Sequence, residues 1–247
     1  ASVWYCMVRL CGLSSGDPNS IINIMLRKQH EAMGAFQNAD RPAAIDLLVE
    51  GIGGLSPAVF TETTPGPGSQ GGGIANYGSL EVYSSDFLQN RSRGDLEDNL
   101  GRGGAIFNRG NLLVRDSNFL RNQASDEAER SVGSGIFNGG LADISRSTFF
   151  ANSGSEGGRG FAIANDDNGE LKLTNSTLSG HVGTGGALSN GYYSNPPSND
   201  PKATLINVTI AGNNGYGVQN SGQLLIRNSL IAGNLGYFGD EVTNCLN

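Results

Sequence analysis

One pattern dominates the chain and recurs six times between Gly72 and Asn234. Each repeat reads roughly as G-x-I-x-N, then a short stretch containing an aliphatic residue, then S-x-F-x-x-N. The first asparagine of the pattern recurs at steps of 32, 30, 27, 25 and 30 residues, at Asn76, Asn108, Asn138, Asn165, Asn190 and Asn220. A period of this length indicates an array whose units bury their apolar faces only by stacking on their neighbours.

Within a repeat, residues of like character alternate over stretches too short for a helix. In the second repeat, Ile106 and Asn108 fall on one side of such a stretch, and Leu112 and Val114 fall on one side of the next. Three such stretches, separated by bends, predict three short strands per coil, with coils stacked about 4.8 Å apart. The predicted fold is therefore all-β: a right-handed parallel β-helix, which is a solenoid.

Stacking converts equivalent positions of the repeats into columns. Three apolar columns are predicted to form the core, and burying most of one such side chain contributes roughly 1.5–3 kcal/mol. They are Ile74, Ile106, Ile136, Ile163, Leu188 and Val218; Val82, Val114, Ile144, Leu173, Leu205 and Ile226; and Phe87, Phe119, Phe149, Leu178, Ile210 and Ile231.

Two polar columns accompany the core. Stacked asparagine amides supply one another with donors and acceptors, so the asparagine column is predicted to be a structural ladder and not a row of ligand-binding groups. A serine column has Val208 in its fifth place, which indicates a packing position and not a nucleophile. Its members are Ser85, Ser117, Ser147, Ser176 and Ser229.

The ends of the chain depart from the repeat. Residues 20–38 carry apolar residues near helical spacing and are predicted to form a helix that caps the first coil. We predict one continuous domain with irregular leading coils and the capping helix at 1–70, regular coils at 71–235, and a C-terminal tail at 236–247. Ala1–Leu10 is predicted to be a strand.

Composition limits the partners. A net charge of −7 and a pI near 4.8 argue against binding to nucleic acid. No apolar run approaches the roughly 18 residues of a membrane-spanning helix, and no signal peptide opens the chain, which suggests a mature secreted form or a fragment. Cys6, Cys11 and Cys245 have no metal-site spacing, and either a Cys6–Cys11 bridge or free thiols is compatible with the sequence. No cofactor or metal site is predicted.

Enzymatic activity was considered because many parallel β-helices are polysaccharide lyases or glycoside hydrolases. Such chemistry needs clustered carboxylates, or calcium with a basic residue. The strand faces and turns offer few candidates: Glu81, Asp143, Glu170, and the adjacent pair Asp166 and Asp167. The two histidines are far apart in sequence, and one of them, His181, stands where other repeats have asparagine. The sequence therefore predicts a protein that is not an enzyme.

Loops between successive coils are the best candidates for binding, because variable loops on a rigid scaffold usually carry it. From each S-x-F-x-x-N segment to the next inward aliphatic residue, the gaps shrink along the chain from 16 to 14, 11, 7 and 5 residues. The longer loops predict either a binding edge or a solvated, salt-bridged edge. The candidate binding residues, including two tyrosines of a separate insertion, are Arg91, Arg93, Asp95, Glu97, Asp98, Arg102, Asp126, Glu127, Tyr192 and Tyr193.

The segments GGAI at 103–106, GGAL at 185–188 and FxxN at 87–90, 119–122 and 149–152 carry a family resemblance. The chain resembles the passenger repeats of chlamydial polymorphic outer membrane proteins and related β-helix surface proteins of other bacteria. This resemblance implies export to the cell surface and a non-catalytic role in adhesion or scaffolding.

Three functions follow as hypotheses. The first is an extracellular or cell-surface structural protein that self-associates into a fibre or surface array, because an uncovered coil offers unpaired strand edges. A partner's strand at Ala1–Leu10 is a candidate to complete the last coil. The second is a monomeric adhesin or carbohydrate-binding module whose partners are glycans or other surface proteins. The third is a polysaccharide lyase or glycoside hydrolase.

Overall fold

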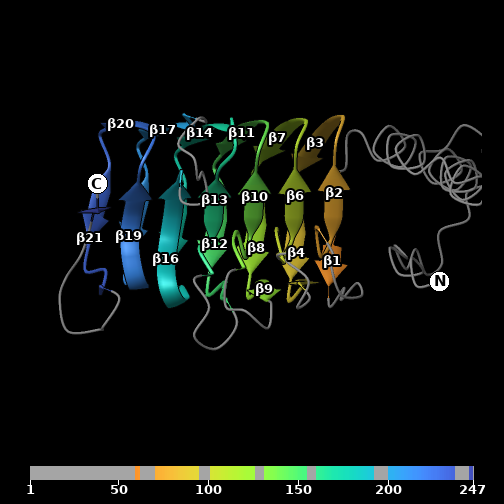
Figure 1. Cartoon of the computed structure of the whole chain (residues 1–247), viewed down its shortest axis with the longest axis horizontal. Coiled ribbons are helices and arrows are strands. Elements are labelled where there is room, and N and C mark those ends of the chain that lie inside the picture. The colour runs from red at the N-terminus through yellow and green to blue at the C-terminus, as the bar shows by residue number, and fades with distance from the viewer. Residues whose placement is uncertain are drawn as a thin grey trace, which may run out of the picture.

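The computed structural model describes residues 59–61, 70–94, 101–125, 131–154, 160–191, 200–236 and 245–246. All the regular elements within these ranges are β-strands, which form a parallel β-solenoid (Figure 1). The predicted all-β solenoid is therefore confirmed. The predicted helix at 20–38 and the predicted strand at Ala1–Leu10 lie outside the described residues.

The chain visits three parallel sheets in turn. Sheet 1 contains the I-x-N strands β2 (Ile74–Asn76), β6 (Ile106–Asn108), β10 (Ile136–Asn138), β13 (Ile163–Asn165), β16 (Val182–Asn190), β19 (Asn214–Asn220) and β22 (Cys245–Leu246). Sheet 2 contains β3 (Ser79–Tyr83), β7 (Asn111–Arg115), β11 (Leu141–Ser145), β14 (Glu170–Thr174), β17 (Lys202–Ile206) and β20 (Gln223–Arg227).

Sheet 3 contains the S-x-F strands, and a short fourth sheet lies beside the inter-coil loops. The strands of sheet 3 are β1 (Val59–Thr61), β4 (Asp86–Leu88), β8 (Asn118–Leu120), β12 (Thr148–Phe150), β15 (Thr177–Ser179), β18 (Thr209–Ala211) and β21 (Leu230–Ala232). The fourth sheet pairs β5 (Arg91–Arg93) with β9 (Gln123–Ser125). In Figure 1 the coils succeed one another along the long axis, from β2 at one end to β19 and β21 at the other.

Strand register places equivalent residues of the repeats directly opposite each other, as the predicted columns require. Ile106 pairs with Ile136, Val114 with Ile144, and Phe119 with Phe149. The phenyl rings of Phe87, Phe119 and Phe149 stack nearly parallel, with centroids 4.7 and 4.5 Å apart. These columns form one continuous hydrophobic core along the axis of the solenoid.

The asparagine ladder is confirmed as a chain of side-chain hydrogen bonds. The Nδ2 of Asn76 donates to the Oδ1 of Asn108 at 2.6 Å, and the same bond links each following pair up to Asn190 and Asn220, at 2.6–2.7 Å. Each amide from Asn76 to Asn190 also donates to a backbone carbonyl at the start of the next coil's sheet 2 strand, as Asn108 does to Leu141 at 3.1 Å. The ladder therefore holds the corner between sheets 1 and 2.

The serine column is a hydrogen-bonded column as well as a packing position. The hydroxyl of Ser117 donates to the carbonyl of Arg115 at 2.8 Å and accepts the backbone N–H of Ser85 from the preceding coil at 3.1 Å. The same pattern recurs at Ser147 and Ser176. Val208 has no hydroxyl, so it makes only one bond of this pattern: its backbone N–H donates to the hydroxyl of Ser229 at 3.0 Å.

Single residues with left-handed backbone turn the chain between sheets 2 and 3. Their φ angles lie between 46° and 54°, a region where asparagine and aspartate are tolerated better than most residues. Three of the six positions are asparagine and one is aspartate: Ser84, Asp116, Arg146, Asn175, Asn207 and Asn228. One residue per corner is sufficient because each corner must only redirect one short strand into the next.

Candidate functional site

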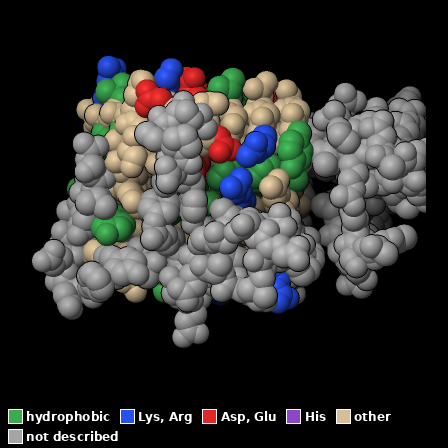
Figure 2. All heavy atoms as spheres, viewed as in Figure 1, with side chains coloured by type: hydrophobic (Ala, Val, Ile, Leu, Met, Phe, Trp, Pro, Cys, Tyr) green, Lys and Arg blue, Asp and Glu red, His purple; other side chains and the backbone are tan. Residues whose placement is uncertain are grey.

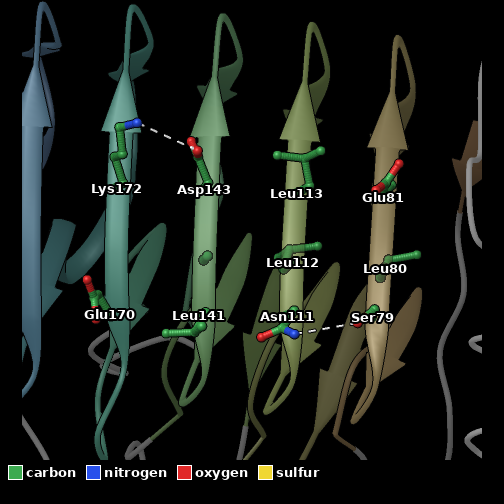
Figure 3. A pocket seen from close by; sticks show the side chains of 11 residues that line it. Ser79, Leu80, Glu81, Asn111, Leu112, Leu113, Leu141, Asp143, Glu170 and Lys172 are labelled. Atoms are coloured by element: carbon green, nitrogen blue, oxygen red, sulfur yellow. Dashed lines mark hydrogen bonds and ion pairs between the residues drawn. The ribbon is translucent and has the colours of Figure 1, made fainter.

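The outer face of sheet 2 carries a shallow groove of about 440 Å³. Figure 3 shows the outward side chains of β3, β7, β11 and β14 in two rows, each row running across the strands. One row contains Ser79, Asn111, Leu141 and Glu170, and the other contains Glu81, Leu113, Asp143 and Lys172. The groove therefore brings together the three strand-face carboxylates that the sequence offered for catalysis.

Two acidic groups of this groove, Asp143 and Glu81, are engaged in ion pairs or a hydrogen bond. Asp143 lies 3.1 Å from Arg115 and 3.7 Å from Lys172, so cations on both neighbouring strands balance its charge. Glu81 accepts a hydrogen bond from the hydroxyl of Tyr83 at 3.0 Å, and this bond is the main cause of the raised pKa of Tyr83. Two of the three carboxylates of the groove are therefore held by side chains of their own or neighbouring strands.

A second cluster lies on the outer face of sheet 1. Phe107 and Phe137 point away from the solenoid core, yet both are buried, with ring centroids 5.2 Å apart. Val132 and Phe161, from the segments that precede β10 and β13, pack against them to form a separate small hydrophobic cluster. Val132 and Phe161 therefore cover part of the outer face of sheet 1.

Cations rim this outer cluster. The guanidinium of Arg102 lies 5.1 Å from the ring centroid of Phe137, and that of Arg109 lies 5.7 Å from the centroid of Phe107. Arg109 also pairs with Asp167 at 2.7 Å. Figure 2 shows hydrophobic, basic and acidic side chains side by side over β2, β6 and β10. Cation–π contacts and the ion pair fix these side chains in place, as expected for a structural surface.

The last described coil is the third site of interest. Ile226 belongs to an inward-facing column whose other five members are 0% exposed, but Ile226 itself is 37% exposed. Leu225 and Leu230 of the same coil are also exposed, and Ile231 is only partly buried. The strands β20 and β21 stand at the ends of sheets 2 and 3, with no further strand beside them among the described residues. This coil combines apolar side chains with two open strand edges.

Comparison of the chain with family models, with curated proteins and with solved structures finds no match. The geometry of the chain itself is therefore the basis for a functional assignment.

The predicted loop residues divide into two groups. Arg91 and Arg93 lie on β5, where the Nε of Arg91 donates to the hydroxyl of Ser125 at 2.9 Å, and Arg102 packs on Phe137 as described above. The remaining candidates lie outside the described residues, and their role in binding stays a prediction; they are Asp95, Glu97, Asp98, Asp126, Glu127, Tyr192 and Tyr193.

The adjacent carboxylates Asp166 and Asp167 do not form a pair open to substrate. Asp166 is buried, whereas Asp167 has a positive φ of 54° and binds Arg109. Within the described part of the chain, no group of three or more histidine, cysteine or acidic residues is arranged to hold a metal ion. The same part contains no helix long and apolar enough to cross a membrane.

A second asparagine ladder runs through the last residue of the S-x-F-x-x-N segments. Asn90 donates to Asn122, Asn122 to Asn152, and Asn213 to Asn234, at 2.7–2.9 Å. His181 occupies the fourth position, as the sequence predicts, and its Nδ1 accepts the backbone N–H of Asn152 at 3.1 Å.

The imidazole of His181 is fully buried, and only one of its two ring nitrogens has a hydrogen-bond partner among the described residues. Its Nε2 is buried without a hydrogen-bond partner in the described structure. Burial lowers the pKa of His181 to about 4, against a smaller opposing effect of its hydrogen bond with the backbone of Asn152. The histidine is therefore neutral at physiological pH and is a structural residue and not an accessible acid or base.

Proposed function

We propose that the protein is a non-catalytic structural protein of the extracellular space or cell surface, and that its solenoids join end to end into a fibre or surface array. The observation that carries this proposal is the exposure of Ile226, a core-column residue, on the last described coil. Apolar core residues beside open strand edges are a template for adding further strands. A second solenoid provides strands of the same length and spacing.

Two further features support a structural role. The asparagine ladder links successive coils, serine hydroxyls bond neighbouring coils, and the rings of Phe87, Phe119 and Phe149 stack in the core, which makes a rigid rod. In the sheet 2 groove, Asp143 is ion-paired with Arg115 and Lys172, and Glu81 accepts a hydrogen bond from Tyr83, which supports a role other than lyase or hydrolase catalysis. A surface location rests on the resemblance of the repeats to bacterial surface proteins.

The proposal includes the handedness of the coil. Connections between parallel strands of one sheet are right-handed in about 98% of cases, because the strand twist favours that hand. Each coil of this solenoid is such a connection, since the chain leaves sheet 1, passes through sheets 2 and 3, and returns to sheet 1. A right-handed parallel β-helix is therefore the form that we propose.

Replacing Ile226 with lysine is expected to abolish end-to-end association. The position of Ile226 belongs to a core column that faces the interior of the solenoid, so a charge placed there loses its hydration when a second copy covers the end. We therefore expect the concentration needed for association to rise about 100-fold or more. The fold should persist, because the side chain at this position is partly exposed and the lysine ammonium can reach water. Sedimentation velocity over a range of concentrations measures the effect.

Thr204→Lys is the matched control, because Thr204 lies on the outer face of sheet 2 opposite Lys172 of the neighbouring strand. This variant should associate like the native protein. A native protein that stays monomeric at every concentration would contradict the proposal and would favour the alternative of a monomeric adhesin or glycan-binding module.

A further inference from the structure

The described strands at the two ends of the solenoid are offset in complementary ways. At the N-terminal end, sheet 3 extends one strand beyond the first full coil, through β1 beside β4. At the C-terminal end, sheet 1 extends one strand beyond the last full coil, through β22 beside β19. Sheet 2 has no additional strand at either end within the described residues.

From this arrangement we infer that each end of the solenoid binds the opposite end of a second copy of the same chain, so that the two copies join head to tail. The second copy is shifted along the solenoid axis by seven strand spacings, here called seven layers. The inference rests on the proposed self-association and specifies its interface. In this join, β21 lies beside β1 of the second copy, and β22 lies beside β2 of the second copy. Sheets 1 and 3 then continue from one copy to the next without a gap.

The register of the join follows from the pairings within each copy. Thr209 pairs with Leu230 on one end, and Val59 pairs with Asp86 on the other, so Leu230 comes opposite Val59. By the same rule Ile231 comes opposite Phe60, which is itself paired with Phe87 of the phenylalanine column. The partly buried Ile231 would then no longer stand at the end of its column. All strands remain parallel, as they are throughout the solenoid.

A displacement of six layers is excluded by the same strands. It would place β20 directly beside β3 of the second copy, but it would also place β21 where β1 already pairs with β4. It would likewise require β22 and β2 of the second copy to occupy one position. The seven-layer join avoids both overlaps and leaves a space of one strand in sheet 2, between β20 and β3. Repetition of such a head-to-tail contact builds an open filament.

Disulfide trapping between two differently substituted full-length copies tests this register. The background replaces Cys6 and Cys11 with serine and Cys245 with valine, the residue type of its partner Val218. One copy carries Val59→Cys and the other carries Leu230→Cys. In the control mixture, one copy carries Glu81→Cys and the other carries Leu225→Cys. In the seven-layer join, these two positions lie two strand spacings apart, about 9.6 Å, which is too far for a disulfide.

Under mild oxidation, the first mixture is expected to give about tenfold more disulfide-linked dimer than the control mixture, because assembly holds its two thiols in contact. Sedimentation of the same samples in reductant reports association independently of the disulfide. Association with a dominant Glu81→Cys to Leu225→Cys link, or with neither link, would overturn the inferred register while the proposed self-association stands. Monomers in reductant would overturn both.

Discussion

Replacing Asn108 with leucine is expected to lower the free energy of unfolding by about 3 kcal/mol, although the change adds apolar volume to the interior. The side chain of Asn108 is completely buried and accepts the Nδ2 of Asn76 while donating to the Oδ1 of Asn138, both at 2.6 Å. Leucine removes one hydrogen-bond partner from the Nδ2 of Asn76, one from the Oδ1 of Asn138 and one from the carbonyl of Leu141, and each such loss costs about 1–3 kcal/mol. Chemical denaturation followed by circular dichroism measures the change.

Asn111→Leu provides a control with the same chemical substitution three residues away. Asn111 lies on the outer face of β7, opposite Leu141, which shows that the position accepts leucine. The control should change stability by less than about 0.5 kcal/mol, as is usual for surface substitutions. Equal effects of the two substitutions would show that the ladder amides do not contribute specifically to stability.

Acidification is expected to destabilise the protein through His181. Its pKa is about 4 in the folded protein and near the ordinary histidine value of 6.5 in the unfolded chain. Between these values the unfolded chain binds more protons, so the stabilising contribution of the neutral imidazole is complete above about pH 7 and is lost as the pH falls toward 4. The difference of 2.5 pKa units corresponds to about 3 kcal/mol.

His181→Asn isolates this contribution, because asparagine occupies the same position in the preceding and following coils, at Asn152 and Asn213. The carboxylates and His30 are present in both proteins, so the comparison isolates the effect of His181. Denaturation midpoints measured from pH 8 to pH 4 should therefore fall more steeply for the native protein, by about 3 kcal/mol over the range. Parallel curves for the two proteins would refute a buried neutral histidine at this position.

The repeated sequence predicts the solenoid and its interior well, because each column is sampled once per coil. A single residue such as Ile136 is ambiguous, but its alignment with Ile106 and Ile163 specifies both an inward direction and a strand register. The asparagine ladder is predictable for the same reason, since a buried amide at every corner must be satisfied by its equivalents.

The outer cluster on sheet 1 could not be predicted from strand alternation. Phe107 and Phe137 occupy outward positions, where alternation predicts exposure, and their burial depends on inter-coil segments of irregular length. Two phenylalanines in consecutive places of one outward column were the available signal, because a solvated face rarely presents stacked aromatic rings. The repeats predict that a partner's strand could complete the last coil, but the additional strands β1 and β22 became visible only in the sheet pairings.

The axial repeat of the assembled native protein tests end-to-end joining most directly. Seven layers at a strand spacing of about 4.8 Å predict a repeat of about 34 Å per subunit along the fibre axis. Electron microscopy of filaments, or fibre diffraction, measures this repeat together with the strand spacing. A repeat of about 34 Å is the result that the account predicts. Particles of single-subunit length at all concentrations, or an array whose repeat is unrelated to this value, would contradict it.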